Sequence, residues 1–298
     1  MRRTFPFCRA VGVLTLAGWL AAGALRADET EGAEIRWAIV DGPPYHNDGP
    51  KGVARSVDEL GDGLTDRLIA GIAAQLPQWR HVLVPTGRSR MWREIQAGRP
   101  LCYADAFKTP ERLRWAYFTL ATAPVPQMLA AREGLLPAGE VSLQALLKQT
   151  DLTAVFERDR SYGPVLDPMI RSAGSQVRIG SLPSTPQLLR MLEAGRMDYL
   201  VEYPLALHYL AQRLQPAPRI SYHALAEERQ PLPSYIACTR SPWGRKAIEA
   251  LDQAMRRWAA QPAAAATLLR SLPAEVARTD GARIEAFYRE RAQRSVIE

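Results

Sequence analysis

The chain carries two hydrophobic periods in turn. Residues 35–39 place apolar side chains at alternate positions, the pattern of a β-strand. Residues 64–76 place them at helical spacing, beginning with Leu64, Leu68 and Ile72. The first predicted strand is therefore followed along the chain by the first predicted helix.

The same two patterns recur along the chain. Further strands are predicted at residues 81–85, 101–104, 127–131, 152–157, 177–180, 198–202 and 234–239. Further helices are predicted at residues 90–97, 142–149 (with Ser142 as cap), 164–173, 185–195 and 205–213, and Ile248, Leu251, Met255 and Trp258 mark a final long amphipathic helix. Strands that alternate with helices predict mostly parallel sheets with helices on both faces, an α/β fold.

The length of 298 residues suggests two domains of this kind. Proline-rich stretches at residues 123–127 and 230–234 are candidate crossings between them. We expect one lobe from residues 28–125, a second from 126–230, and a return of residues 231–298 to the first lobe. The composition, with 23 Pro, 20 Gly and 47% hydrophobic residues, is that of a globular protein.

The N-terminus has the pattern of a secretory signal peptide. Arg2, Arg3 and Arg9 precede an apolar stretch of 16 residues, and small residues follow it. We predict cleavage after Ala27, with Ala24 as the rival site. The stretch is short for a membrane anchor, and the paired arginines leave open whether export uses the Sec or the twin-arginine route.

Cleavage changes the interpretation of the charge. Removing residues 1–27 takes away four arginines and no acidic residue, so the net charge falls from +7 to +3. No run of five like charges and no nucleic-acid-binding motif remains. We therefore expect a soluble mature protein that does not bind nucleic acid.

Cleavage also removes Cys8 and leaves Cys102 and Cys238. Two cysteines in an exported chain are candidates for a disulfide. The alternative is two separate buried thiols. A bridge would place two remote parts of the first lobe side by side.

Candidate ligand-binding residues follow four of the predicted strands. Ligands of open parallel sheets bind beyond the carboxyl ends of the strands, and these positions are rich in aromatic, charged and hydroxyl groups. The candidates are Asp41, Tyr45, Asp105, Phe107, Arg112, Ser161, Tyr162, Gly163, Glu202 and Tyr203.

Each candidate also has a purely structural interpretation. Arg112 either holds a ligand carboxylate or forms a surface ion pair with an acid such as Glu111. Ser161 and the amides after it either cradle an anion or form an ordinary helix cap. Glu202 either binds a ligand cation or pairs with an arginine. The Tyr45 ring either stacks on a ligand or packs in its turn, and Arg88 and Arg90 are expected to be solvated.

Sequence signals for catalysis and for metal binding are missing. There is no G-x-S-x-G, H-E-x-x-H, P-loop or C-x-x-C motif. The four histidines have no metal-ligand spacing. We therefore predict no cofactor, no metal and no enzyme activity. An acid/base pair of Asp105 and Glu202 remains the enzymatic alternative.

In order along the chain, these features resemble the family 3 extracellular solute-binding proteins, the periplasmic amino-acid-binding type. The match spans nearly all of the mature chain, and Thr109-Pro110-Glu111-Arg112 is its most specific element. The others are Trp37 to Tyr45, a helix with Gly61 and Asp66, Ala97-Gly98-Arg99, Ser161-Tyr162-Gly163, Met191 to Asp198, and Tyr235-Ile236-Ala237-Cys238.

The resemblance implies a type II periplasmic-binding-protein fold, two lobes joined by two hinge crossings. By the family pattern, Arg112 binds the ligand's α-carboxylate, Ser161 to Gly163 offer amides, and Glu202 or Tyr203 occupies the place of the ammonium-binding acid. Asp105 and Phe107 replace the family's small residues before the arginine element, so the resemblance does not imply a standard amino acid as the ligand. The cysteine pair and the run Glu202-Tyr203-Pro204 indicate a divergent branch of the family.

The expected function follows from this resemblance. We expect a monomeric periplasmic protein that closes on a small polar, carboxylate-bearing ligand, and closure is what an ABC-type permease or a membrane sensor reads. Two alternatives stay open: a dehydratase-like enzyme on the same fold, and an envelope interaction module without a ligand.

Overall fold

The structure is a computed structural model. It describes residues 34–40, 42–47, 52–174, 177–180, 185–214, 216 and 219–298. The predicted signal peptide and the candidate ligand residue Asp41 lie outside the described residues.

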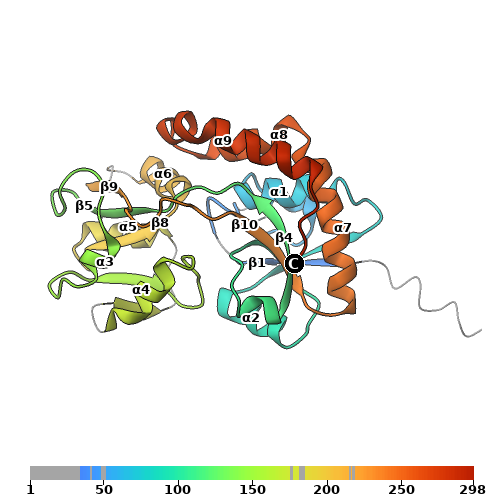
Figure 1. The fold of residues 1–298 in the computed structure, drawn as a ribbon, viewed down its shortest axis with the longest axis horizontal. Helices are drawn as coiled ribbons and strands as arrows, with labels where there is room; N and C mark the ends of the chain where they lie inside the picture. The colour runs from blue at the N-terminus through green and yellow to red at the C-terminus, as the bar shows by residue number, and fades with distance from the viewer. Residues whose placement is uncertain are drawn as a thin grey trace, which may run out of the picture. The chain divides into compact units, whose positions relative to one another are not determined.

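The strands form two five-stranded sheets (Figure 1). The first has the order β2 (Arg80–Pro85), β1 (Glu34–Ile39), β3 (Cys102–Ala106), β10 (Ser234–Thr239) and β4 (Ala116–Thr122). The second has the order β7 (Val177–Gly180), β6 (Ala154–Glu157), β8 (Tyr199–Glu202), β5 (Met128–Arg132) and β9 (Ile220–Ala224). We call each sheet with its packed helices a lobe.

Each sheet is mostly parallel with one opposed strand. In lobe 1, β10 runs antiparallel to both β3 and β4. In lobe 2, β5 runs antiparallel to both β8 and β9. The chain leaves lobe 1 between β4 and β5 and returns between β9 and β10, so β10 completes the first sheet with residues from beyond the second. This topology confirms the predicted α/β fold with two crossings.

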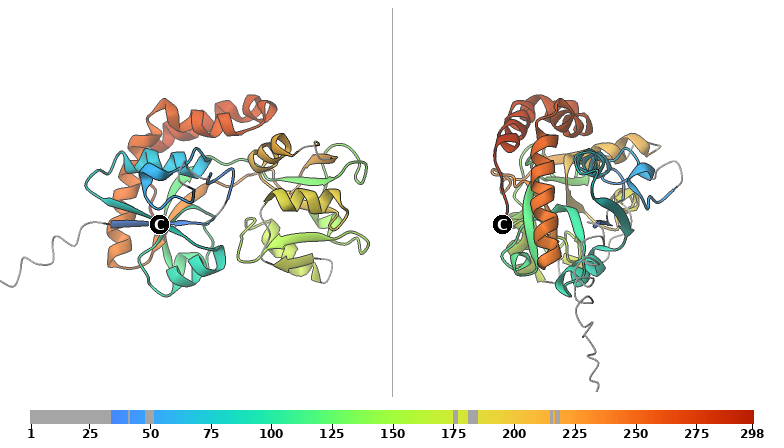
Figure 2. Two further views of the ribbon diagram at one scale, coloured as in Figure 1. Left: turned by 180° about the vertical axis from the view of Figure 1, so that it is seen from behind. Right: turned by 90° about the vertical axis from the view of Figure 1, so that its right-hand side faces the viewer.

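Helices cover both faces of the first sheet because its strands alternate their apolar side chains. Trp37 and Ile236 face one core, and Ala38 and Ala237 face the other. The first core is closed by α1 (Leu64–Ala73), α7 (Pro242–Ala259), α8 (Pro262–Ser271) and α9 (Ala274–Gln293), and the second by α2 (Arg88–Gln96). Figure 2 shows α8 and α9 side by side in both views.

The second sheet is covered in the same way. Leu129 and Val201 face one core, and Ala130 and Leu200 face the other. The first of these cores includes α3 (Leu143–Leu146) and α4 (Leu166–Ser172), and the second includes α5 (Thr185–Glu193) and α6 (Pro204–Arg213). The short helices η1 (Val57–Glu59) and η2 (Arg112–Arg114) lie in lobe 1.

Among the described residues, two strands and two α-helices lie where the sequence pattern predicts none. They are β4, β9, α8 and α9. The predicted final helix, α7, is therefore not the last one. Its register is still that of the prediction, since Ile248, Leu251 and Met255 are fully buried.

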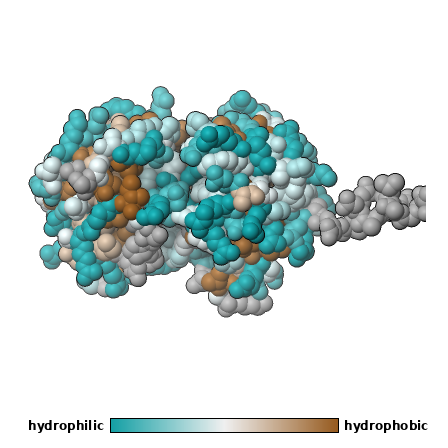
Figure 3. Space-filling view, turned by 90° about the horizontal axis from the view of Figure 1, so that it is seen from below, coloured by the Kyte–Doolittle hydropathy of each residue, from teal (hydrophilic) through white to brown (hydrophobic). Residues whose placement is uncertain are grey.

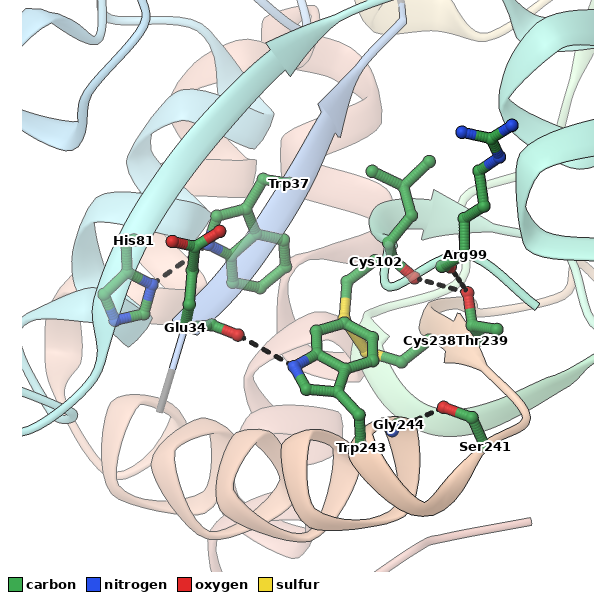
Figure 4. The surroundings of a disulfide bond; sticks show 11 residues. Glu34, Trp37, His81, Arg99, Cys102, Cys238, Thr239, Ser241, Trp243 and Gly244 are labelled. Carbon is green, nitrogen blue, oxygen red and sulfur yellow. Dashed lines mark hydrogen bonds between the residues drawn. A yellow bond between two sulfur atoms is a disulfide. The ribbon is translucent and has the colours of Figure 1, made fainter. Parts of the chain in front are cut away.

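A disulfide joins Cys102 of β3 to Cys238 of β10, which confirms the predicted bridge (Figure 4). The two cysteines are directly opposed in the antiparallel pair. Just after it, Ser241 caps α7 by accepting from the Gly244 amide at 3.0 Å. A Cβ at Gly244 would lie 1.7 Å from a main-chain oxygen, so this turn requires glycine.

A buried ion pair holds the C-terminal helix against lobe 1. Arg291 of α9 is 1% exposed and donates to Asp252 of α7 at 2.7 Å. It also donates to the Leu120 carbonyl at 2.8 Å. Beyond α9, the amide and carbonyl of Glu298 pair with those of Phe118. The tail thus covers the outer edge of β4, which would otherwise expose unpaired backbone groups.

The surface seen from below is mainly hydrophilic, with hydrophobic residues gathered on lobe 2 at the left (Figure 3). Val165 and Ile179 are among the exposed large apolar side chains of this lobe. Within the described ranges, no helix combines the length and the apolar character needed to cross a membrane.

Candidate functional site

A small cavity lies between the strand ends of the two lobes. A water-sized group can occupy about 50 Å³ of it, and because a single water molecule needs roughly 10–15 Å³ on this measure, the cavity holds a few non-hydrogen atoms. Its lining residues are Tyr45, Arg88, Tyr103, Asp105, Phe107, Arg112, Arg160, Ser161, Tyr203 and Ser234.

Six of the residues predicted from strand ends line this cavity. Tyr45, Asp105, Phe107 and Arg112 come from lobe 1, and Ser161 and Tyr203 come from lobe 2. Tyr162, Gly163 and Glu202 do not line it, and Asp41 is not described. Residues that are up to 158 positions apart in sequence, Tyr45 and Tyr203, thus meet at one site.

Arg112 is held by its own turn and by lobe 2. Its amide donates to the Thr109 hydroxyl at 3.2 Å, and its guanidinium stacks on the Trp92 ring, 4.2 Å from the centroid. The guanidinium donates to the carbonyls of Phe107 (3.0 Å) and Asp159 (2.9 Å). Neither carbonyl carries a charge, and Arg112 forms no ion pair with any residue that the structure describes.

The electrostatic surroundings of Arg112 favour an anion. Burial, together with the neighbouring Arg88 guanidinium, lowers the pKa of Arg112 to about 10. The side chain is therefore still a cation at neutral pH, and an approaching negative charge would stabilise it. The predicted alternative, a surface pair with Glu111, is not formed, since Glu111 lies next to Arg114.

Arg88 is not solvated as predicted. Its side chain is 11% exposed, and it donates to Glu157 of lobe 2 at 3.1 Å and to the Tyr103 hydroxyl at 3.0 Å. It follows the end of β2 by three residues, so the strand-end rule could have found it. Arg90 is exposed as predicted and lies near Glu94.

Glu202 is paired within the protein. Both oxygens of its carboxylate accept from the Arg160 guanidinium at 2.7 Å, and one also accepts from the Tyr203 amide at 2.8 Å. The side chains are 14% (Arg160) and 6% (Glu202) exposed. Burial lowers the pKa of Arg160, but the Glu202 carboxylate outweighs this effect and raises it well above its ordinary value.

The turn after β6 is also satisfied from within. The Ser161 hydroxyl and the Tyr162 amide both donate to Asp167 at 2.6 Å, and the Gly163 amide donates to the Ser161 hydroxyl at 3.2 Å. The amides of Tyr162 and Gly163, which were predicted to offer an anion site, thus donate to Asp167 and to the Ser161 hydroxyl. The Tyr162 ring packs edge-on against Phe156 in the core of lobe 2.

Tyr45 and Tyr203 bring phenol groups to the cavity from opposite lobes. Burial raises the pKa of Tyr45, and the Glu202 and Asp105 carboxylates raise it further. Burial and Asp105 do the same for Tyr203. Both phenols are therefore neutral hydrogen-bonding groups. The backbone of Gly63 packs closely against that of Tyr45. A side chain at Gly63 would not fit, because its Cβ would lie 2.3 Å from the Tyr45 carbonyl oxygen.

Direct contacts between the lobes surround the cavity. Asp159 accepts from Arg112 through its carbonyl and from the Ser89 hydroxyl through its side chain. It adopts a left-handed backbone conformation, with φ of 62°, which is uncommon outside glycine and asparagine or aspartate. The Phe107 and Tyr203 rings lie 6.4 Å apart across the same boundary. These contacts bring the lobes together on the cavity.

An open crevice of about 970 Å³ adjoins the cavity, and Arg112, Arg160 and Ser161 line both. Trp92 and Trp115 contribute to its wall in lobe 1, and this crevice gives room for a ligand larger than the inner cavity. Among the described residues, no group of three or more His, Cys, Asp or Glu side chains is placed to hold a metal ion.

No protein-family model matches the sequence, and a comparison with curated proteins finds no match. Solved structures do resemble it. A putative L-cystine ABC transporter protein from Listeria monocytogenes has a TM-score of 0.64 at 15% identity, covering 82% of this chain and 97% of that one.

Two further structures extend the likeness. A histidine kinase sensor domain similar to periplasmic binding proteins has a TM-score of 0.62 at 18% identity, covering 80% of this chain and 96% of its own. An amino-acid ABC transporter substrate-binding protein from Streptococcus pneumoniae, bound to L-arginine, has a TM-score of 0.58 at 15% identity. The match covers 89% of this chain and 97% of that one. The chain has the type II periplasmic-binding-protein fold that the sequence predicted.

Proposed function

We propose that this protein is a periplasmic solute-binding protein whose lobes close on a small carboxylate-bearing ligand. The observation that carries this proposal is the placement of Arg112. It is a cation without an acidic partner among the described residues, and it lines a cavity between two lobes. A desolvated guanidinium is a strong binding group for a carboxylate because it can form two parallel charge-assisted hydrogen bonds.

The moving parts follow from the two crossings. We propose that residues 28–125 and 231–298 move as one lobe and residues 126–230 as the other. Closure would form the contacts between Arg88 and Glu157 and between Arg112 and Asp159. A signal peptide cleaved near Ala27 would deliver the protein to the periplasm.

The partner that reads the closed form is a membrane protein of one of two kinds. Structural neighbours include binding proteins of ABC importers and a histidine kinase sensor domain. An importer and a sensor would both recognise the closed arrangement of the lobes. We propose a monomer, since one chain supplies both sides of the cavity.

The two alternatives are less well supported. An enzyme with Asp105 and Glu202 as an acid/base pair would need Glu202 to leave the Arg160 guanidinium, which holds both of its oxygens. A module without a ligand would need no cavity, yet one is present and Arg112 lines it.

A thermal-shift screen of the mature chain tests the proposal. The probes are organic acids, amino acids and short peptides, each measured with the wild type and with Arg112→Gln. A ligand at a hundred times its Kd stabilises the folded protein by about 2.7 kcal/mol and raises its melting temperature. We expect at least one carboxylate to stabilise the wild type and not the variant. Equal shifts in both proteins, or no shift with any probe, would contradict the proposal.

A further inference from the structure

The inner cavity has room for only one end of most ligands. A water-sized group can occupy about 50 Å³ of it, which is enough for a carboxylate and a few attached atoms. The crevice of about 970 Å³ begins at the same place, because Arg112, Arg160 and Ser161 line both spaces. A ligand that puts its carboxylate on Arg112 in the cavity therefore has the rest of its body in the crevice.

The crevice has walls from both lobes. Lobe 1 contributes residues of α2 and of the turn that leads into η2, and lobe 2 contributes residues of the segment from β6 to α4. Its volume lies at the upper end of the range for small-molecule sites. A chain that extends outward from Arg112 would thus contact both lobes along its length.

The walls of the crevice mix apolar and polar surface. Pro110, Pro164, Pro168 and Ile179 are exposed in it, and Trp115 is half-buried. Serine, threonine, glutamine and arginine side chains lie among them. A long hydrocarbon chain would cover these polar groups without giving them hydrogen bonds, which is unfavourable. A peptide offers apolar side chains and amide groups together, so it suits this wall better.

Most charged groups of the crevice are engaged within the protein. Each of its acidic side chains has a partner among the described residues, and so do two of its cations. The acids are Glu111 with Arg114, Glu157 with Arg88, Asp159 with Ser89 and Asp167 with Ser161, and the cations are Lys108 with Glu298 and Arg160 with Glu202.

Three further cations of the crevice have no such partner. Arg93 of α2 and Arg171 of α4 are exposed, and neither forms an ion pair with a residue that the structure describes. Arg112 is the third. The crevice therefore presents one cation at its inner end and one on the wall of each lobe. This arrangement complements a ligand with a terminal carboxylate and further negative charges along its length.

Resting on the proposed solute-binding function, we propose that the ligand is a short acidic peptide bound by its C-terminal carboxylate. The carboxylate and a small C-terminal residue lie in the inner cavity at Arg112, and the preceding residues lie in the crevice, where their acidic side chains approach Arg93 and Arg171. The nitrogen of a C-terminal residue is a neutral amide. Such a ligand needs no acid for an ammonium group beside Arg112, and Glu202 is already held by Arg160.

The test uses matched peptides in calorimetric titrations of the mature chain. The main probe is acetyl-Glu-Xaa-Glu-Gly, with Xaa varied over the standard residues. Its C-terminal amide removes the carboxylate, acetyl-Gln-Xaa-Gln-Gly removes the side-chain charges, acetylglycine removes the part in the crevice, and octanoate replaces that part by hydrocarbon.

The proteins are the wild type, Arg112→Gln and the double variant Arg93→Gln/Arg171→Gln. The matched control is Arg114→Gln/Arg229→Gln, which removes one exposed arginine from each lobe outside the crevice. Because Arg93 and Arg171 are exposed, their replacement leaves the folded core intact.

We expect the acidic peptide to bind the wild type more tightly than acetylglycine by about tenfold or more, because the residues in the crevice add apolar contact. Amidation of its C-terminus, or Arg112→Gln, should weaken binding by about thirtyfold or more. The wild type should prefer the glutamate peptide over the glutamine peptide by about threefold or more. This preference should disappear in Arg93→Gln/Arg171→Gln and persist in the control.

Other results overturn the inference. If acetylglycine bound as tightly as every peptide, or octanoate bound more tightly, the crevice would not hold a peptide, and binding through Arg112 would leave the proposed function standing. A preference for glutamate that survives Arg93→Gln/Arg171→Gln would remove the role of the two wall cations. No binding of any carboxylate, in these titrations and in the thermal-shift screen, would end both proposals.

Discussion

The two lobes share one fold but differ in how the arginines that line the cavity, Arg112 and Arg160, are paired. In lobe 2, Glu202 is paired with Arg160, and Asp167 satisfies the turn at Ser161. In lobe 1, Arg112 has no acidic partner in the described part of the chain and lines the cavity with Asp105. This difference fits the proposal that Arg112 of lobe 1 holds the carboxylate of the ligand.

Lobe 1 is also the more strongly braced of the two. The disulfide Cys102–Cys238 and the buried pair of Arg291 with Asp252 both lie within it. A rigid support keeps binding groups in position when the other lobe moves away. The lobe that carries Arg112 is thus the one with a covalent brace.

Removal of the disulfide should have the largest effect on stability. It closes a loop with a sequence separation of 136 residues, for which the chain-entropy model gives about 5 kcal/mol. We expect Cys102→Ala/Cys238→Ala to lose up to about this amount of unfolding free energy in denaturant titrations. Hydrogen exchange should show the loss of protection mainly in lobe 1. An equal loss in lobe 2 would contradict the distinction between the lobes.

Disruption of the buried pair in lobe 2 should have the next largest effect. Glu202→Ala leaves the Arg160 guanidinium buried without its carboxylate, which costs about 3–5 kcal/mol in comparable cases. The matched control is Glu140→Ala, because Glu140 pairs with Arg229 at an exposed site, where such pairs contribute about 1 kcal/mol or less. If chemical denaturation gave similar losses for both variants, the pair would not be the internal support that we describe.

Acidification should weaken lobe 1 through Asp252. Burial raises the pKa of this carboxyl, but hydrogen bonds from Ser295, Thr119 and Val296 and the charge of Arg291 outweigh burial and lower it below the ordinary 3.8. A lowered pKa in the folded state stabilises the fold above pH 3.8, and this contribution is lost as the pH falls further.

The pH dependence of stability measures this smallest effect. We expect the unfolding free energy of the wild type to fall below about pH 4, and more steeply than that of Asp252→Asn, which has no carboxyl to titrate there. Identical slopes for the two proteins below pH 4 would show that Asp252 does not contribute.

Much of the architecture was predictable because most elements follow a clear hydrophobic period. Two of the elements that escaped prediction, β9 and α9, have weak hydrophobic patterns. β9 is an edge strand in which one of five residues, His223, is buried. In α9 the buried residues are Ile284, Tyr288 and Arg291, and the last of these is a charged residue held by an ion pair.

The location of the candidate site was predictable from the sequence, but the pairing of its charged groups was not. The rule that ligands bind at strand ends identified six of the cavity-lining residues. It did not reveal that Arg160 pairs with Glu202, because 42 residues separate them and either could have met a ligand. The burial of Arg88 was missed for a similar reason, since its partner Glu157 lies in the other lobe. Which charges neutralise each other is decided by tertiary structure.

The most direct test of the account is the affinity of Arg112 variants for the ligand found in the screen. Calorimetry would compare the wild type with Arg112→Ala and with Arg114→Ala, which removes the same charge from an exposed neighbour. We predict that Arg112→Ala weakens binding by about 2–4 kcal/mol, roughly 30- to 900-fold, and that Arg114→Ala stays within about twofold. An unchanged affinity in Arg112→Ala would contradict the account.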